Sequence, residues 1–154
     1  MYKYNTVALG GTFDIIHKGH IALLSKAFSI SSHVIIGLTG DTLALKKNKS
    51  LIHDYTNRLK LLTNVLEKKF PNSSYTISKL DNDFGPAAIE GKVDALVVSD
   101  ETSNKGKILN DLRKSRNLPL VEIVTVPMVL ADDGNRISST RIKNSEIDTE
   151  GNLS

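Results

Sequence analysis

Apolar residues follow two alternating patterns along the chain. Short runs of consecutive apolar residues, several of them β-branched, predict buried strands at 6–9, 34–38, 75–78, 95–99 and 120–126. Between these runs, apolar residues recur every three or four positions, which predicts helices over about 18–30, 59–70 and 103–117. A further short helix is expected to begin near Ser138. The stretch 41–55 is polar and is expected to be irregular, and 146–154 is expected to be a flexible tail.

Strands that alternate with helices are typical of βα units and a parallel sheet. The strand runs are apolar without alternation, so helices are expected to cover both faces of the sheet. We therefore expect an α/β fold, a Rossmann-like doubly wound sheet of about five parallel strands. Ligands of such sheets bind at the carboxyl ends of the strands, so the turn after the first strand is the first place to search for chemistry.

The composition narrows the function classes. The length of 154 residues fits one domain over 1–154, and the absence of cysteine excludes disulfides, thiolate metal ligands and a cysteine nucleophile. No apolar run approaches the roughly 18 residues of a membrane helix, and no signal-peptide core is visible, so we expect a cytoplasmic protein without a membrane partner. Aromatic residues make up only 5% and the net charge is only +3, so no nucleic-acid partner is expected.

The turn after the first predicted strand has the composition of an anion site. Gly10 and Gly11 would let the backbone approach a ligand closely, and Gly19 leaves room for a bulky polyphosphate. The next helix opens at about residue 18, where backbone N–H groups without intrahelical partners and the helix dipole favour a phosphate. His17 and His20 are three residues apart, so both imidazoles can face one point and donate to charge developing on a phosphoryl oxygen.

Three other interpretations of this turn stay open. The two histidines could belong to a zinc site, although no carboxylate stands at helical spacing and cysteine is absent. The glycines could form a dinucleotide loop, although the Gly-x-Gly-x-x-Gly spacing is absent. The histidines could also be structural residues at a helix start.

A second candidate anion site lies at 137–142. Ser138 and Ser139 are good helix N-caps, and with Thr140 they place three hydroxyl groups beside free backbone N–H groups. Arg141 adds a forked cation that suits phosphate oxygens. Ordinary capping with a surface arginine is the alternative. Two helix starts that face each other could hold both ends of a triphosphate.

These motifs resemble a known superfamily. Gly-Thr-Phe-Asp followed by His-x-Gly-His is the signature of the nucleotidyltransferase superfamily of adenylyl- and cytidylyltransferases, and the chain matches it at every fixed position between 11 and 20. Ile-Ser-Ser-Thr at 137–140 resembles the adenylyltransferase motif. Motifs at 36–41, 97–102, 131–134 and 146–151 (Glu-Ile-Asp-x-Glu-Gly) extend the likeness over about residues 5–151. Together they resemble the archaeal and eukaryotic type of phosphopantetheine adenylyltransferase, with its nucleotidyltransferase fold.

The resemblance implies a reaction and its residues. ATP and 4′-phosphopantetheine would give dephospho-coenzyme A and pyrophosphate by direct in-line attack, and Mg²⁺ would neutralise the leaving pyrophosphate. His20 would stabilise the pentacovalent α-phosphate, His17 would assist, and Thr12 would bond the reacting phosphate. The serines and threonine of the second motif would hold the β- and γ-phosphates. The residues implied to bind ATP are Gly10, Gly11, Thr12, Phe13, His17, Gly19, His20, Ser138, Ser139, Thr140 and Arg141. No protein residue is expected to ligate a metal.

The resemblance also implies a lysine after the second strand that binds the attacking phosphate. The candidates are Lys46, Lys47 and Lys49, of which Lys47 is favoured as a catalytic and substrate-binding residue. Arg58 stands at the arginine of the family's Pro-Tyr-x-x-Arg motif and is expected to bind substrate. Asp54 replaces the proline of that motif.

Two other functions stay open at this point. The chain could be a nucleotidyltransferase with another acceptor, such as FMN, nicotinamide mononucleotide or glycerol phosphate, or it could be a non-catalytic nucleotide-binding sensor. The presence of both His17 and His20 favours catalysis, because binding a phosphate needs only N–H groups and a cation. A monomer is expected.

Overall fold

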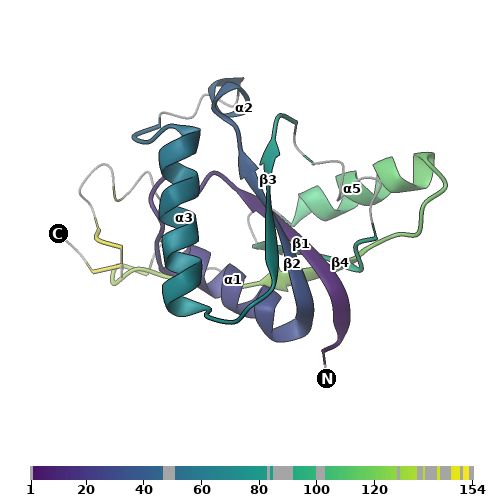
Figure 1. Ribbon diagram of the computed structural model, residues 1–154, viewed down its shortest axis with the longest axis horizontal. Helices are drawn as coiled ribbons and strands as arrows, with labels where there is room; N and C mark the ends of the chain where they lie inside the picture. The colour runs from purple at the N-terminus through teal and green to yellow at the C-terminus, as the bar shows by residue number, and fades with distance from the viewer. Residues whose placement is uncertain are drawn as a thin grey trace.

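Five parallel strands form one sheet, in the order β3-β2-β1-β4-β5 (Figure 1). Their bounds are Tyr4–Gly11 for β1, Ser31–Thr39 for β2, Tyr75–Leu80 for β3, Ala95–Ser99 for β4 and Glu122–Val126 for β5. All neighbouring strands run parallel. The computed structural model describes residues 2–46, 51–82, 84, 92–99, 103–127, 129–134, 137, 142, 147–149 and 151–152. The predicted α/β fold is confirmed.

Helices cover both faces of the sheet, as expected. α1 (Lys18–Ile30) and α3 (Tyr55–Lys69) pack on one face through Leu24 and Leu62, and α5 (Asn104–Ser115) packs on the other through Leu109. A further helix, α2 (Asp41–Lys46), follows β2, so the prediction of an irregular stretch over 41–55 is wrong for its first six residues and for Tyr55, where α3 begins. Within the described part of the chain, no helix is long and apolar enough to cross a bilayer.

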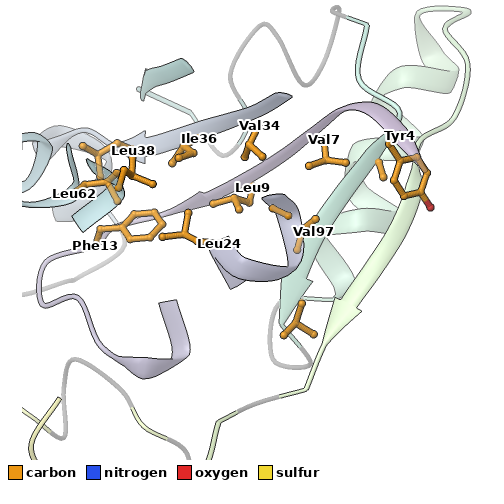
Figure 2. Close-up of a cluster of buried hydrophobic side chains, with 14 residues drawn as sticks. Tyr4, Val7, Leu9, Phe13, Leu24, Val34, Ile36, Leu38, Leu62 and Val97 are labelled. Carbon is orange, nitrogen blue, oxygen red and sulfur yellow. The ribbon is translucent and has the colours of Figure 1, made fainter. Parts of the chain in front are cut away.

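The hydrophobic core lies on both sides of the central strand β1. Val7 and Leu9 point to the α1 and α3 face, where they meet a cluster that continues into β2 (Figure 2). Ala8 points to the opposite face and packs in a second cluster with Leu96 and Leu109. Successive side chains of a strand point to opposite faces, so a strand covered on both sides needs apolar residues at every position.

The strand order places the turn after β1 at the point where the sheet reverses direction. The chain adds β2 and then β3 on one side of β1, and it then crosses to β4 on the other side. In doubly wound sheets, ligands bind at the carboxyl ends of the strands at such a reversal. The turn that carries both histidines begins at Gly11, the last residue of β1, and therefore lies at this position.

The C-terminal segment is packed against the domain, so the prediction of a flexible tail over 146–154 is wrong for 147–149 and 151–152. Ile147 is only 2% exposed and lies in a third apolar cluster with Ala131 and Ile137. The carbonyl oxygen of Gly151 accepts a hydrogen bond of 2.9 Å from the amide of Asp132. The sequence did not reveal this packing because Ile147 is one apolar side chain among polar neighbours.

Candidate active site

His17 and His20 form a hydrogen-bonded pair at the start of α1. His17 is the N-cap residue, and its Nδ1 accepts the amide of Gly19 at 3.1 Å. The amide of His17 donates in return to Nδ1 of His20, also at 3.1 Å. This reciprocal arrangement is a capping box in which imidazoles replace the usual hydroxyl and carboxylate groups. The two rings stack with centroids 3.9 Å apart, so the structure brings the predicted catalytic histidines together.

The capping box fixes which ring nitrogen carries the proton. In both histidines Nδ1 accepts a hydrogen bond from a backbone amide, so in the neutral rings the proton must sit on Nε2. Each imidazole is therefore held in the tautomer that carries a hydrogen on Nε2, and this Nε2–H group is a donor before any ligand binds. Fixed donors of this kind suit the stabilisation of charge that develops on a phosphoryl oxygen.

The amides of the α1 start are not free, which corrects one expectation. The first helical amide, that of Lys18, donates to the carbonyl oxygen of Thr149 at 3.1 Å. The next two amides, those of Gly19 and His20, donate to Nδ1 and the carbonyl oxygen of His17. The prediction that these backbone N–H groups lack partners and bind phosphate is therefore wrong. The donors that this helix start offers to an anion are imidazole groups, and the dipole of α1 still favours a negative charge there.

Two glycines of the turn make room for rings rather than for a ligand. A Cβ atom on Gly11 would lie 3.0 Å from the ring of Phe13, and a Cβ atom on Gly19 would lie 2.9 Å from Cε1 of His17. Gly19 was expected to leave space for a polyphosphate, but the atom that a side chain there would meet belongs to His17. The missing side chain of Gly19 lets the His17 ring fold back over the helix start and cap it.

Phe13 holds a strained backbone conformation beside the histidines. Its φ is 52°, in the left-handed region that costs a residue with a side chain about 1–3 kcal/mol. Its ring is buried in the core cluster near Leu24 (Figure 2) and lies 4.8 Å from the ring of His20. The surrounding core therefore imposes this conformation. Strain of this kind is concentrated at functional sites.

Arg58, which was predicted to bind substrate, is buried and bonded to backbone carbonyl groups. Its side chain, on α3, is fully buried, and its guanidinium group donates to the carbonyl oxygens of Thr12 (2.9 Å), Thr39 (2.6 Å) and His53 (3.1 Å). It also donates to Oδ1 of Asp41 at 2.7 Å. In this arrangement Arg58 joins the turn after β1 to the end of β2 and to the segment before α3. The motif identified the position, but its burial could not be read from the sequence.

Asp41 shares its carboxylate between Arg58 and the start of α3. Partial desolvation raises the pKa of Asp41, but the hydrogen bonds from the Arg58 side chain and the Tyr55 amide, together with the Arg58 charge, outweigh it and hold the pKa below its usual value. A lowered pKa in the folded state gives stability that is present above the unfolded value of about 3.9 and is lost as the pH falls through the folded value.

Asp41→Asn is therefore expected to destabilise the protein at neutral pH by about 1 kcal/mol, a modest figure because the Asp41 side chain is 45% exposed. The difference in unfolding free energy between wild type and variant should shrink as the pH is lowered from 7 to about 3. Urea unfolding at several pH values measures it. A difference that stays constant or grows on acidification would contradict the ion pair.

Asp14, the last residue of the Gly-Thr-Phe-Asp motif, was not predicted as a site residue. Its carboxylate is buried and accepts the amides of Ile52 and His53, both at 2.9 Å. Nδ1 of His53 lies 2.9 Å from the Asp14 carbonyl oxygen and 3.2 Å from its Oδ1. Asp14 thus fixes the segment that leads into α3 against the turn after β1. Its position in the Gly-Thr-Phe-Asp motif was the feature of the sequence that could have identified it.

Several predicted site residues lie outside the described residues, namely Lys47, Lys49, Ser138, Ser139, Thr140 and Arg141. Lys46 ends α2 and is exposed, Thr12 is half-buried, and Gly10 lies in β1. Among the residues that the structure describes, no group of three histidines or carboxylates is placed to hold a metal ion.

Comparison with known proteins agrees with the geometry. The sequence model of the cytidylyltransferase-like family matches residues 8–145. The phosphopantetheine adenylyltransferase of Methanothermobacter thermautotrophicus is 40% identical over 151 residues, covering 98% of this chain and 90% of its own. That of Methanosarcina acetivorans is 41% identical, covering 96% and 94%.

A solved structure shares the fold. The crystal structure of a protein of unknown function from Archaeoglobus fulgidus superposes with a TM-score of 0.71 at 29% identity, covering 79% of this chain and 88% of that one. The family match spans most of the chain, and the strand order and the paired histidines at the sheet reversal agree with it. The chain therefore belongs to the cytidylyltransferase-like nucleotidyltransferases and, within them, to the phosphopantetheine adenylyltransferase family.

Proposed function

We propose that this enzyme transfers the adenylyl group of ATP to 4′-phosphopantetheine, giving dephospho-coenzyme A and pyrophosphate. The observation that carries the proposal is the stacked His17–His20 pair, whose Nδ1 atoms are both occupied by backbone amides. A protein that only bound nucleotide would need no donors fixed in this way. The relatives named for this activity, 40% and 41% identical over nearly the whole chain, supply the substrate pair.

The chemistry is a single displacement at phosphorus. An oxygen of the phosphate of 4′-phosphopantetheine forms a bond to the α-phosphorus of ATP while the bond to the β-phosphate bridging oxygen breaks, and pyrophosphate leaves. No covalent enzyme intermediate is needed, so the protein contributes position and charge stabilisation. Nε2–H of His20 donates to the α-phosphate as its negative charge grows. Nε2–H of His17, whose ring stacks on that of His20, donates to ATP as well.

The remaining phosphate contacts come from the family motifs. In this proposal Thr12 bonds the reacting phosphate, Lys47 binds the attacking phosphate, and Ser138, Ser139, Thr140 and Arg141 hold the β- and γ-phosphates. Arg58 acts indirectly, because its hydrogen bond to the Thr12 carbonyl oxygen fixes the strained turn that carries Thr12 and Phe13.

Magnesium enters as part of the MgATP substrate. Mg²⁺ keeps several waters and is usually held by substrate phosphates rather than by a protein cage. The described residues fit that mode, because the carboxylate of Asp14, within the turn that leads to the histidines, already accepts two backbone amides. The ion would neutralise charge on the leaving pyrophosphate.

Pyrophosphate release tests the proposal. The purified protein is incubated with MgATP and 4′-phosphopantetheine, and in parallel with FMN, nicotinamide mononucleotide or glycerol phosphate as acceptor. We expect release with 4′-phosphopantetheine and a product of the mass of dephospho-coenzyme A. Release with another acceptor alone would reassign the substrate, and nucleotide binding without release from any acceptor would indicate a sensor.

A further inference from the structure

The described residues of the Glu-Ile-Asp-x-Glu-Gly motif near the C-terminus, with Asn152 after it, are joined by hydrogen bonds, and the proposed chemistry leaves them without a role. We call residues 147–149 and 151–152 the C-terminal turn. Within it, the amide of Gly151 donates to the carbonyl oxygen of Asp148 at 3.1 Å, and the amide of Asp148 donates to the carbonyl oxygen of Asn152 at 2.9 Å. The Asp148 carboxylate accepts the amide and the side-chain nitrogen of Asn152, at 2.9 and 3.1 Å. These bonds give the turn one defined shape.

The C-terminal turn is fixed to the preceding segment, residues 131–137, at two points. Ile147 is buried with Ala131 and Ile137, and the carbonyl oxygen of Gly151 accepts the amide of Asp132. Gly151 has φ of 86°, and a Cβ atom there would lie 2.7 Å from Cδ1 of Ile137 and 3.1 Å from Cα of Ala131. Glycine at this position is thus required both by the backbone conformation and by the close approach of the turn to the domain.

The turn presents one carbonyl group to the start of α1, the helix that carries the histidine pair. The Thr149 carbonyl oxygen accepts the Lys18 amide, the first helical amide of α1, at 3.1 Å. Lys18 follows the N-cap residue His17 and lies inside the His17–His20 capping box. The backbone that positions both rings is therefore held by the capping box within α1 and by the hydrogen bond from Lys18 to the C-terminal turn.

We infer that the C-terminal turn positions the catalytic histidines, with the Thr149 carbonyl group as the positioning contact. The inference rests on the proposed function. Displacement of a catalytic group by about 1 Å can cost about a hundredfold in rate, so a contact that fixes the first turn of α1 affects the chemical step more than nucleotide binding. Because the contact uses a backbone carbonyl group, the side chain at 149 is free to vary.

Lys18→Pro removes this contact selectively. Proline is favoured at the first helical position, and the residue before it prefers extended backbone, which His17 already has with φ of −132° and ψ of −179°. The proline lacks the N–H group, and its Cδ atom occupies the space that the amide hydrogen directed toward Thr149. Lys18→Ala is the matched control, because it removes the exposed lysine side chain and keeps the amide.

We expect kcat of Lys18→Pro to be about 10- to 100-fold below that of Lys18→Ala, with KM for ATP changed less than about threefold. The imidazole proton resonances of His17 and His20, assigned with single-histidine variants, should shift in Lys18→Pro and not in Lys18→Ala. That readout does not depend on turnover. Gly151→Ala, which displaces the turn from its other end, should also lower kcat, and it replaces Lys18→Pro if that variant does not fold.

The outcomes separate the two claims. A wild-type protein that releases no pyrophosphate would refute the proposed function, and unshifted histidine resonances in Lys18→Pro would then refute the positioning contact independently. An active wild type with a folded Lys18→Pro or Gly151→Ala variant that retains the kcat of Lys18→Ala would overturn the inference alone.

Discussion

Replacing His20 with alanine is expected to lower kcat by at least about a hundredfold while the fold and ATP binding are retained. The expected loss follows from the removal of a fixed Nε2–H donor from a charge that grows in the transition state, an effect of about 3–4 kcal/mol for a single well-placed donor. Initial rates of pyrophosphate release measure kcat, and calorimetric titration with an unreactive ATP analogue measures binding.

His20→Asn and His20→Gln separate the catalytic role from the capping role. Nδ1 of His20 accepts the amide of His17, and the Oδ1 atom of asparagine offers an acceptor at a similar distance from the backbone without a group in place of Nε2. We expect His20→Asn to be more stable than His20→Ala and equally inactive. Glutamine places an N–H group nearer to the Nε2 position and should recover part of the activity. Wild-type turnover by His20→Asn would show that His20 serves only as a cap.

Replacing Arg58 with methionine is expected to destabilise the protein by about 3–5 kcal/mol. The substitution keeps an apolar side chain of similar length but leaves three carbonyl oxygens and the Asp41 carboxylate without their donor. Native domains are stable by only about 5–15 kcal/mol, so this loss is a large share of the total. Urea unfolding monitored by circular dichroism gives the value.

Lys60→Met is the matched control for Arg58→Met. Lys60 lies on the same helix, α3, and is exposed, so its replacement should change stability by less than about 0.5 kcal/mol. The turnover of Arg58→Met at a temperature where it is folded should also fall, because the Thr12 carbonyl group loses its anchor. An Arg58→Met protein as stable as Lys60→Met would mean that the buried guanidinium group is not what joins these segments.

The fold could be predicted from the sequence because its strands are apolar on both faces. Runs such as 34–38 and 95–98 have no polar position, and they lie in β2 and β4 of the parallel sheet. α2 was missed because a six-residue helix is too short to show the helical repeat of apolar residues. The predicted monomer and the cytoplasmic location stay predictions.

The sequence was enough to predict which residues form the site, but not which hydrogen bonds they make. The spacing of His17 and His20 placed both rings at the start of α1, but no pattern of residues indicated that they cap the helix themselves and occupy its amides. The contact from Thr149 joins residues 131 positions apart through backbone atoms alone, and no side-chain pattern records such a bond. Arg58 was expected to bind substrate from its place in the family motif, and its burial could not be predicted because its partners include backbone carbonyl groups distant in the sequence.

A crystal structure with an unreactive ATP analogue and Mg²⁺ is the most direct test of the imidazole donors. If the Nε2–H groups of His17 and His20 donate to the α-phosphate, an α-phosphate oxygen should lie within about 3.2 Å of at least the His20 Nε2 atom. The capping box should stay intact. A nucleotide bound away from this turn, or an α-phosphate held by backbone amides of α1 with both imidazoles turned away, would contradict it.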